Sequence, residues 1–195
     1  MARLNLPRTF PYNSGMETFG PDHVQNILDQ FDLGLTVQHF DRSTFSSADA
    51  AAAIGCELGQ IAKSLCLLID GKPVLVVASG DQKVSDAKLA RHFGVGRKKV
   101  KIADAETCVE VFGYAPGGVS PVGHRTPALP IYIDETLSRW PEIHAAAGTD
   151  QDNFTLTFEQ LKTITGGTVL DVAKDSIANA VTFLERAGVD PLEEK

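Results

Sequence analysis

Cysteine is scarce in this sequence, and long apolar runs are absent from it. The 195 residues include three cysteines, Cys56, Cys66 and Cys108, which form no C-x-x-C pair. An odd number of isolated cysteines argues against a disulfide framework and a zinc site, so we expect buried, reduced thiols. No apolar run approaches the roughly 20 residues that a membrane-spanning helix needs. The first residues contain no apolar stretch followed by a cleavage site of small residues, so we predict a cytoplasmic protein without a membrane partner.

Several motifs that would mark a cofactor or a nucleophile are also missing. Residues 94–99 read GVGRKK, which does not match the G-x-G-x-x-G of dinucleotide-binding loops, and no P-loop occurs. We therefore expect neither a cofactor nor a metal. Ser120, His124 and Asp134 are the residue types of a hydrolase triad. A nucleophile elbow, however, reads G-x-S-x-G and uses the N–H after its serine, which Pro121 lacks. A serine esterase acting through Ser120 stays open as a third hypothesis.

What the sequence does contain is the composition of an ordinary globular domain. Hydrophobic residues make up 43% and charged residues 22% of a 20.9 kDa chain, which predicts one domain with a substantial core. The net charge of -7 disfavours a general nucleic-acid coat protein, and we expect no DNA partner. Residues 88–101 form a basic segment within this acidic chain, with six Lys or Arg and no Asp or Glu. The segment is either a solvated helix and turn or a face that contacts RNA. Its cations are Lys88, Arg91, Arg97, Lys98, Lys99 and Lys101.

Apolar spacing predicts an α+β domain with a mixed sheet. We expect an irregular arm at residues 1–20 and a single domain over 21–195. Helices are predicted at 22–34, 48–54, 86–93, 104–112, 158–165 and 176–187, and strands at 35–40, 64–69, 73–79, 99–103, 131–133, 141–147, 154–157 and 168–172. Asp22, Ser47 and Asp104 are the expected helix caps, and Asp70-Gly71 predicts a hairpin. Because helices and hairpins follow one another without a regular βαβ alternation, a doubly wound sheet is disfavoured.

Residues 113–130 hold four glycines and four prolines, too many for a helix or a central strand. We predict a long shaped loop there, and long loops in compact domains are often functional. Residues 117–124 within it read GGVSPVGH, and the adjacent glycines let backbone N–H groups and the Ser120 hydroxyl approach a polar ligand. The alternative is a surface turn tightened by Gly and Pro, with His124 exposed or hydrogen-bonded instead of catalytic.

Lys63 stands where the chain enters the apolar run at 64–69. A lysine in such a place either reaches solvent from the strand end or is paired inside the protein. As a functional residue it would be a point charge at the mouth of a pocket, able to hold a phosphate or a carboxylate. Both interpretations stay open on the residue alone.

Eight short segments, taken together and in order, resemble a known family. They are IAKSL at 61–65, DG at 70–71, SGD at 79–81, VKIAD at 100–104, GY at 113–114, GGVSPVG at 117–123, IDE at 133–135 and AGT at 147–149. This order is similar to that of the YbaK/EbsC family, which is related to the editing insertion domain of bacterial prolyl-tRNA synthetases. The resemblance runs from about residue 35 to residue 172. It implies a compact mixed-sheet, barrel-like fold with the pocket on one face.

The resemblance also implies an activity and a set of site residues. Members of the family are free-standing domains that hydrolyse mischarged aminoacyl-tRNA, commonly tRNA for proline, and an aminoacyl-tRNA synthetase is the other partner to consider. By this match Lys63 anchors the phosphate or sugar end of the terminal adenosine, Phe45 lines the pocket entrance, and Asp134 with Gly148-Thr149 helps to form the floor. The implied catalytic set is Lys63, Gly118, Ser120 and His124, and the substrate-binding set is Phe45, Ser64, Gly117, Val119, Pro121, Gly123, Asp134, Gly148 and Thr149.

Our leading hypothesis is therefore a trans-acting aminoacyl-tRNA deacylase, a hydrolase of a carboxylic ester. An aminoacyl ester is already activated, so holding it and orienting a water can suffice without a protein nucleophile. Arg91, Arg97, Lys98, Lys99 and Lys101 are then the expected contacts to the acceptor stem. The runner-up is a module that binds aminoacyl-tRNA, a nucleotide or a synthetase without turnover. Residues 150–154 and His124-Arg125 depart from the best-known cysteine-specific members, so cysteine is not predicted as the amino acid removed.

Overall fold

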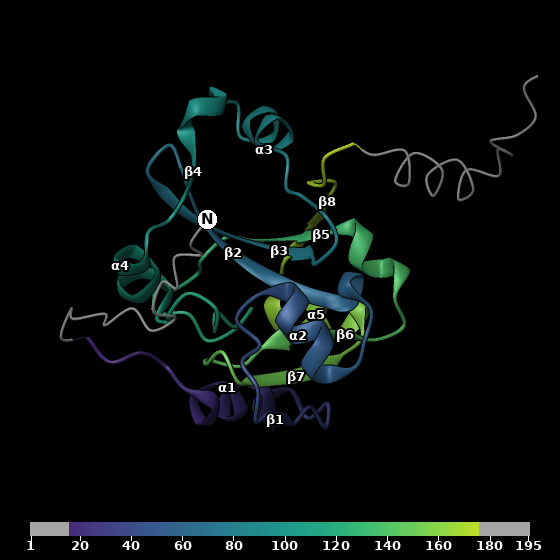
Figure 1. Ribbon diagram of the computed structural model, residues 1–195. Coiled ribbons are helices and arrows are strands. Elements are labelled where there is room, and N and C mark those ends of the chain that lie inside the picture. Colours follow the sequence, from purple (N-terminus) through teal and green to yellow (C-terminus); the bar gives the residue numbers. More distant parts are fainter. Residues whose placement is uncertain (1–15, 176–195) are drawn as a thin grey trace, which may run out of the picture.

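The fold is a mixed sheet with helices packed against it, seen in a computed structural model that describes residues 16–175 (Figure 1). The predicted last helix at 176–187 and the predicted arm up to residue 15 lie outside these described residues. Residues 16–20 have no regular structure, as predicted. They are nevertheless tied to the domain, because the backbone N–H of Phe19 donates to Gly113 O at 2.8 Å.

Eight strands form one sheet in the order β1, β7, β6, β2, β3, β5, β8, and β4 pairs with β2 outside this path (Figure 1). Neighbours are antiparallel in β1·β7, β7·β6, β2·β3 and β2·β4, and parallel in β6·β2, β3·β5 and β5·β8. The predicted mixed-sheet α+β class is therefore confirmed. The strands are β1 Val37–His39, β2 Ile61–Ile69, β3 Lys72–Ser79, β4 Val100–Ile102, β5 Ile131–Asp134, β6 Ile143–Ala146, β7 Asp152–Leu156 and β8 Thr168–Leu170.

The central hairpin of β2 and β3 forms where the Asp-Gly turn predicted it. Asp70 and Gly71 have φ values of 50° and 79°, and a type I′ turn requires positive φ at both central positions. The prediction missed the start of β2, which begins at Ile61, three residues before the expected run. Lys63 therefore lies inside the strand and not at its entrance.

Helices begin at capping residues, though not always at the expected ones. Ser46, not Ser47, caps α2, because its Oγ accepts a backbone N–H of the first turn at 3.1 Å. Asp22 lies in the first turn of α1 instead of capping it, whereas Asp104 caps α4 as predicted. The helices are α1 Pro21–Leu28, α2 Ser47–Ile54, α3 Asp86–His92, α4 Ala105–Thr107 with a π-helical continuation η4 Cys108–Phe112, and α5 Phe158–Thr165. Short 3-10 turns are η1 Asp29–Phe31, η2 Leu58–Gln60, η3 Arg97–Lys99 and η5 Glu135–Arg139.

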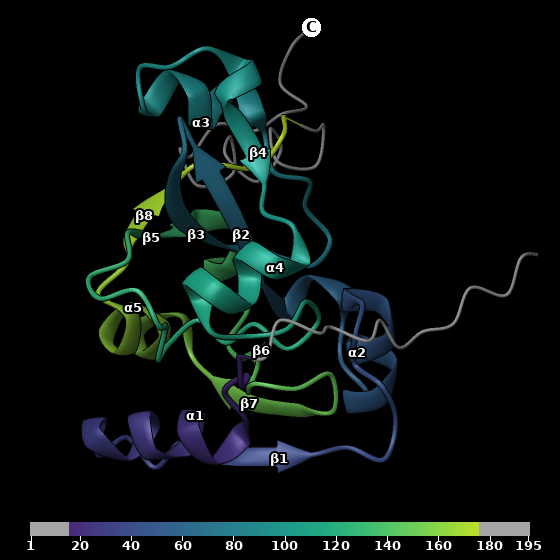
Figure 2. The same cartoon turned by 90° about the vertical axis from the view of Figure 1, so that its left-hand side faces the viewer.

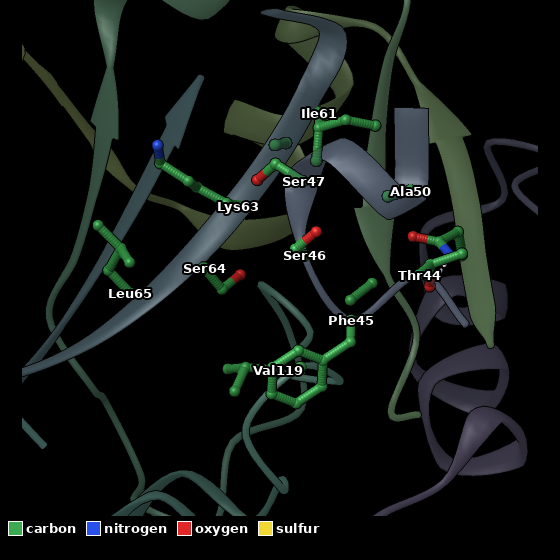
Figure 3. A pocket seen from close by; sticks show the side chains of 14 residues that line it. Thr44, Phe45, Ser46, Ser47, Ala50, Ile61, Lys63, Ser64, Leu65 and Val119 are labelled. Carbon is green, nitrogen blue, oxygen red and sulfur yellow. Dashed lines mark hydrogen bonds between the residues drawn. The ribbon is translucent and has the colours of Figure 1, made fainter. Parts of the chain in front are cut away.

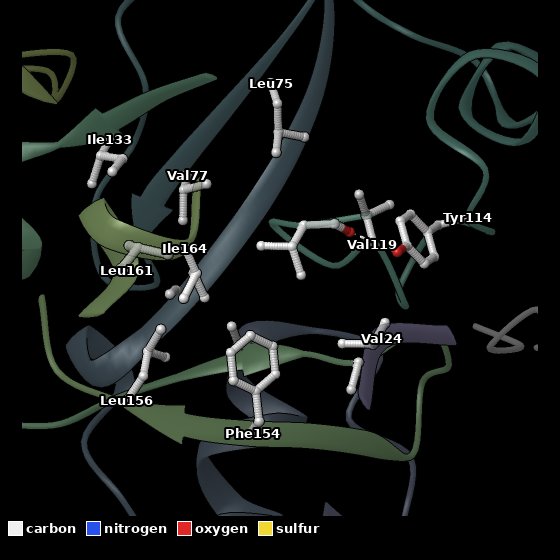
Figure 4. Close-up of a cluster of buried hydrophobic side chains, with 14 of the residues drawn as sticks. Val24, Leu75, Val77, Tyr114, Val119, Ile133, Phe154, Leu156, Leu161 and Ile164 are labelled. Carbon is white, nitrogen blue, oxygen red and sulfur yellow. Dashed lines mark hydrogen bonds between the residues drawn. The ribbon is translucent and has the colours of Figure 1, made fainter. Parts of the chain in front are cut away.

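Side chains of β2 alternate between two separate hydrophobic clusters, as a strand buried on both faces requires. Ala62 belongs to the larger cluster and Leu67 to the smaller one. By the same alternation, Lys63 and Ser64 point to opposite faces of the sheet. Figure 4 shows part of the larger cluster, including Val24, Tyr114, Val119, Phe154 and Leu161.

The three cysteines are free thiols, but they are not equally buried. Cys66 and Cys108 are buried in the larger cluster, as predicted. Cys56 is only half-buried, which corrects the prediction, because it follows the end of α2 on a loop.

Different helices and strands lie at the two ends of the molecule. Figures 1 and 2 show α3 and β4 at one end and α1 with β1 at the other. In Figure 2, α2 and α5 lie on opposite sides of β6 and β7. β2 joins the two ends, because it pairs with β6 at its start and with β4 at its finish. No helix within residues 16–175 is long and apolar enough to cross a membrane.

Candidate active site

A pocket of about 360 Å³ lies beside β2, between that strand, the start of α2 and the first part of the long loop (Figure 3). Five of the predicted site residues line it, namely Phe45, Lys63, Ser64, Gly117 and Val119. Lys63 is the single ionisable side chain of this lining. The remaining wall consists of Thr44, Ser46, Ser47, Ala50, Ile61, Ala62, Leu65, Ala146 and Asn153. The pocket is thus neutral except for one cation.

Lys63 supplies that cation and is held by two backbone carbonyls. Its Nζ donates to Gly80 O at 3.3 Å and to Gln82 O. An ammonium group has three N–H donors, so one is left for a ligand. Burial lowers the pKa of Lys63, while the carboxylates of Asp81 and Asp134 favour its charged form. The site therefore holds an oriented lysine whose charge depends on its neighbours.

The edge of β2 beside the pocket lacks a partner strand over residues 63–66. β6 pairs with the first two residues of β2 and β4 with the last three, and no other described strand covers the interval on that side. Across this edge the N–H of Ala103 donates to Cys66 O at 2.9 Å. Alternate residues of a strand direct their backbone groups the same way, so Ser64 directs its N–H and C=O to the same edge.

The Ser64 side chain adds an unmet polar group to this edge. Its Oγ is buried and finds no hydrogen-bond partner among the described residues. In Figure 3 the hydroxyl points into the space beside Phe45. Because buried polar groups in native proteins are normally paired, an orphan hydroxyl in a pocket marks a place for a ligand's polar atom.

Phe45 forms one rim of the pocket by lying over Gly117. Phe45 is 50% exposed, and a Cβ on Gly117 would collide with the Phe45 ring. Gly117 also has a φ of 94°, a conformation that other residues rarely adopt. Glycine is therefore required here both for backbone conformation and for room.

Thr44 and Asn153 fix the segment that carries Phe45, although the sequence analysis did not single them out. Asn153 Nδ2 donates to Thr44 Oγ1 at 2.9 Å, and Thr44 Oγ1 donates to Asp150 O at 3.0 Å. No motif marks these residues. Only the pairing of β1 with β7 brings the two segments together.

Gly118, Gly148 and Thr149 lie behind the pocket and not in its lining. Gly148 N–H donates to Gly118 O at 3.0 Å, and a Cβ on Gly118 would be 2.7 Å from Gly148 O. The Thr149 hydroxyl donates to the carboxylate of Asp152. The lining therefore includes neither Gly118 of the implied catalytic set nor Gly148 and Thr149 of the implied floor.

Ser120, Pro121, Gly123 and His124 do not reach the Lys63 pocket. Ser120 is fully buried, and its Oγ accepts the N–H of Val122 at 3.3 Å. His124 Nε2 donates to the carbonyl of Ser120 at 2.9 Å and not to its hydroxyl, so no Ser–His pair is assembled. Pro121, Gly123 and His124 line a different cavity of about 240 Å³. Burial lowers the pKa of His124 to about 4, which keeps its ring neutral at physiological pH.

Asp134 lies beneath Lys63 without lining the pocket. It is fully buried, and its Oδ2 accepts the Thr136 hydroxyl at 2.6 Å. Burial raises the pKa of Asp134, partly offset by the hydrogen bonds from Thr136. Neither Asp134 nor any other described carboxylate belongs to a group of three His, Cys, Asp or Glu side chains that could hold a metal ion.

The basic segment lies at the α3 and β4 end of the molecule, away from the pocket (Figure 1). Lys99 forms an ion pair with Asp70 at 2.9 Å, and Lys88 is paired with Asp171 and Asp175. The remaining predicted RNA contacts are exposed: Arg91, Arg97, Lys98 and Lys101. The structure therefore separates the two groups of predicted site residues.

Comparison with known proteins identifies the scaffold. Residues 41–164 match the family model of the aminoacyl-tRNA editing domain. The chain is 33% identical to YwhH of Bacillus subtilis over 154 residues, which cover 78% of this chain and 96% of YwhH. It is 30% identical over 129 residues to the Enterococcus faecalis protein named "Putative Cys-tRNA(Pro)/Cys-tRNA(Cys) deacylase EbsC", covering 65% of this chain and 76% of that protein. A proline–tRNA ligase of Geobacter sp. is 35% identical over 78 residues, 40% of this chain and 13% of the ligase.

A solved structure shares the fold. It is described as "Crystal structure of a putative trans-editing enzyme for prolyl tRNA synthetase", and it superposes with a TM-score of 0.73 and 37% identity over 80% of this chain and 97% of that chain. The family match spans more than half of the residues and agrees with the sequence resemblance. The chain therefore belongs to the aminoacyl-tRNA editing domain family, among its YbaK/EbsC-like members.

Proposed function

We propose that this protein is a trans-acting aminoacyl-tRNA deacylase, which hydrolyses the ester between a wrongly attached amino acid and the terminal ribose of tRNA. The observation that carries the proposal is the pocket beside β2, where one half-buried lysine, held by two backbone carbonyls, stands among neutral walls on the scaffold of an editing family. tRNA for proline is the leading substrate, because the names of EbsC and of the matching ligase both refer to proline or its tRNA.

In this proposal Lys63 supplies charge and not a nucleophile. Its remaining N–H donor binds a phosphate or ribose oxygen of the terminal adenosine. Water attacks the ester carbonyl, the bond from that carbon to the ribose oxygen breaks, and the ribose oxygen takes a proton. The products are a free amino acid and an uncharged tRNA. Because the ester is activated, positioning and charge neutralisation supply the rate enhancement.

The walls of the pocket favour a small, uncharged amino acid. Ala50, Ala146 and Asn153 leave no countercharge for an acidic or basic side chain. At the open edge of β2, Ser64 offers a carbonyl to the substrate's α-ammonium group and a hydroxyl to its ester. We assign Phe45 and Val119 to the rim that covers the bound aminoacyl group.

The basic segment is proposed to hold the acceptor stem. β2 connects the two regions, and the six residue steps from Lys63 to Ile69 span about 20 Å at roughly 3.3 Å per step. A tRNA acceptor end that enters the pocket thus continues toward Arg97, Lys98 and Lys101. A basic patch steers RNA onto a protein whose net charge is otherwise acidic.

The central test is deacylation of a panel of mischarged tRNAs by the wild type and by Lys63→Ala. We expect wild-type turnover of at least one mischarged tRNA, and a loss of at least about 100-fold in kcat/KM for the variant, since removal of one preorganised electrostatic donor costs about that much. Lys162→Ala is the matched control, because Lys162 pairs with Glu159 on the exposed face of α5. RNA binding without turnover of any substrate would favour the runner-up, a non-catalytic binding module. Undiminished activity of Lys63→Ala would remove Lys63 from the mechanism.

The placement of the acceptor stem has its own test. Arg97, Lys98 and Lys101 are replaced together by Gln, and tRNA affinity is measured at several salt concentrations. We expect weaker binding and a salt dependence flattened by about one slope unit for each phosphate that the variant no longer neutralises. Hydrolysis of a minimal aminoacyl-adenosine stays at the wild-type rate, because the pocket is separate. Equal affinities and slopes would leave the segment as a solvated turn.

A further inference from the structure

Asp81 and Arg139 form an ion pair directly behind Lys63. Arg139 Nη2 donates to Asp81 Oδ1 at 2.7 Å and to Oδ2 at 3.0 Å. The side chains of Arg139 and Asp81 are only 21% and 31% exposed. β3 and β5 are parallel neighbours, so the segments that follow their carboxyl ends meet at the same edge of the sheet. The pair bridges those two segments.

Asp81 is central to the turn that holds the lysine. The two carbonyls that accept from Lys63 belong to Gly80 and Gln82, the residues on either side of Asp81. The Asp81 carboxylate also lies 2.7 Å from the Ser79 hydroxyl and accepts Gln82 Nε2 at 3.2 Å. The side chain of Asp81 therefore fixes the same turn whose backbone fixes Lys63.

Arg139 is itself rigidly placed. Its Nε donates to Thr136 O at 2.7 Å, and its Nη2 donates to the Ser79 hydroxyl at 3.0 Å. The guanidinium lies 5.6 Å from the centre of the Trp140 ring. The first hydrogen bond fixes Arg139 within η5, and the second ties it to the end of β3.

We infer that Asp81 and Arg139 are positioning residues for the deacylase: the pair holds the turn whose Gly80 and Gln82 carbonyls bind the Lys63 ammonium group beside the pocket, and its balance of charge sets how readily Lys63 stays protonated. This inference rests on the proposed function, in which the protonated form of Lys63 binds the substrate. Neither residue belongs to the pocket lining, so we assign their effect to Lys63.

Two carboxylates act on Lys63, and one of them is paired with an arginine. Asp81 acts on it from the turn after β3 and Asp134 from β5, while Arg139 on η5 pairs with Asp81. Asp171 acts one step further away, on Asp134. The walls from α2, the long loop, β6 and β7 present no ionisable side chain. Loss of Asp81 therefore removes a negative neighbour of the lysine, and loss of Arg139 leaves that negative neighbour unneutralised.

Replacement of Asp81 and replacement of Arg139 should therefore shift the pKa of Lys63 in opposite directions. In Asp81→Asn, the alkaline limb of the kcat/KM profile moves to lower pH, because the ammonium form loses a stabilising carboxylate. In Arg139→Met it moves to higher pH. We expect displacements of about one pH unit, and a loss of about ten-fold in kcat/KM at pH 7 in either variant because the turn loosens. The uncatalysed hydrolysis of the ester is subtracted at each pH.

A direct titration of Lys63 supplies a second readout. The ε-CH₂ resonance of Lys63, identified by its loss in Lys63→Ala, is followed by NMR against pH in each variant. The double variant Asp81→Asn/Arg139→Met carries neither charge, so the Lys63 titration should return close to that of the wild type while the activity loss persists. Glu159→Gln, which removes an exposed ion pair on α5, is the control and should leave both readouts unchanged.

The outcomes separate this inference from the function on which it rests. If Lys63→Ala is inactive but Asp81→Asn and Arg139→Met keep wild-type profiles and titrations, or shift the same way, the positioning role is overturned and the proposed function stands. If Lys63→Ala stays fully active, the role of the lysine in catalysis fails, whereas the NMR titrations still report whether the pair controls Lys63. Opposite shifts in both readouts support the inference.

Discussion

The glycine-rich loop has two halves with the same residue types and different surroundings. Residues 117–119 face the Lys63 pocket, where Gly117 lies against the exposed ring of Phe45. Residues 120–124 turn away and pack near Tyr114 and His23. The Tyr114 hydroxyl donates to Val122 O at 2.6 Å, and His23 Nε2 donates to Gly123 O at 2.8 Å.

The difference shows that a polar residue of the loop has a structural role when its polar atoms form hydrogen bonds within the loop itself. The hydroxyl of Ser120 and the ring nitrogen of His124 both have partners within the loop. The pocket-facing half lies beside β2, where a polar atom lacks a partner: the Ser64 hydroxyl is buried and unpaired among the described residues. Satisfaction of hydrogen bonds, and not residue type, thus separates the scaffold from the site.

The largest effect expected from the buried half is a loss of stability in acid. His124 is neutral in the fold with a pKa of about 4, whereas an unfolded histidine titrates near 6.5. The unfolded chain therefore binds a proton that the folded chain does not, and stability falls as pH drops from about 6.5 toward about 4, with no change above pH 7. Between pH 7 and pH 5 this amounts to about 2 kcal/mol.

Urea unfolding at the two pH values checks this, with His124→Gln as the comparison. Glutamine keeps an N–H donor for the Ser120 carbonyl but cannot titrate, so the variant should lose less stability between pH 7 and pH 5 than the wild type. If the wild type and His124→Gln lose the same unfolding free energy between pH 7 and pH 5, His124 does not titrate as a buried group. The assignment of residues 120–124 to the packed half would then be contradicted.

In the pocket-facing half, activity should depend on the size of the side chain at position 117. In Gly117→Ala the new Cβ meets the Phe45 ring, so we expect kcat/KM to fall about ten-fold as the rim moves, equivalent to about 1.4 kcal/mol. Gly166→Ala is the matched control, because Gly166 also has positive φ, at 60°, but has no atom near its would-be Cβ. Both variants incur the backbone cost of about 1 kcal/mol in unfolding free energy. Equal activities of the two would contradict the role of Phe45 at the rim.

The smallest effect on activity is expected for Ser120→Ala. The variant lacks the acceptor for the N–H of Val122, which costs about 1 kcal/mol of unfolding free energy. Its kcat/KM, corrected for the folded fraction, should stay within about two-fold of the wild type. A ten-fold loss, or labelling of Ser120 by a fluorophosphonate probe, would instead return this serine to catalysis.

Much of the local structure could be predicted from short-range patterns. The Asp-Gly turn predicted the β2–β3 hairpin because a type I′ turn needs residues that tolerate positive φ. α5 lies where apolar spacing predicted it, between the capping Thr157 and Gly166 with its positive φ. The predictions failed where neighbouring residues compete for one role, as at the Ser46 and Ser47 cap, since either serine fits the same local pattern.

The candidate site was predictable only in part. The family resemblance named Phe45, Lys63, Ser64, Gly117 and Val119, which the structure brings together. It also named Ser120 and His124, which the structure places in the packed half of the loop. Thr44 and Asn153 carried no signal in the sequence, because their contact depends on the pairing of β1 with β7.

The type and approximate limits of most described elements, the turn chemistry and the family could all be read from the amino-acid sequence, because they depend on residues close together in the chain. Which half of the loop faces the pocket, and what holds Lys63, became clear only in three dimensions. Asp81 and Arg139 are 58 residues apart and meet only because β3 and β5 pair in parallel. Such contacts follow from long-range strand pairing, which the periodicity of a single segment does not encode.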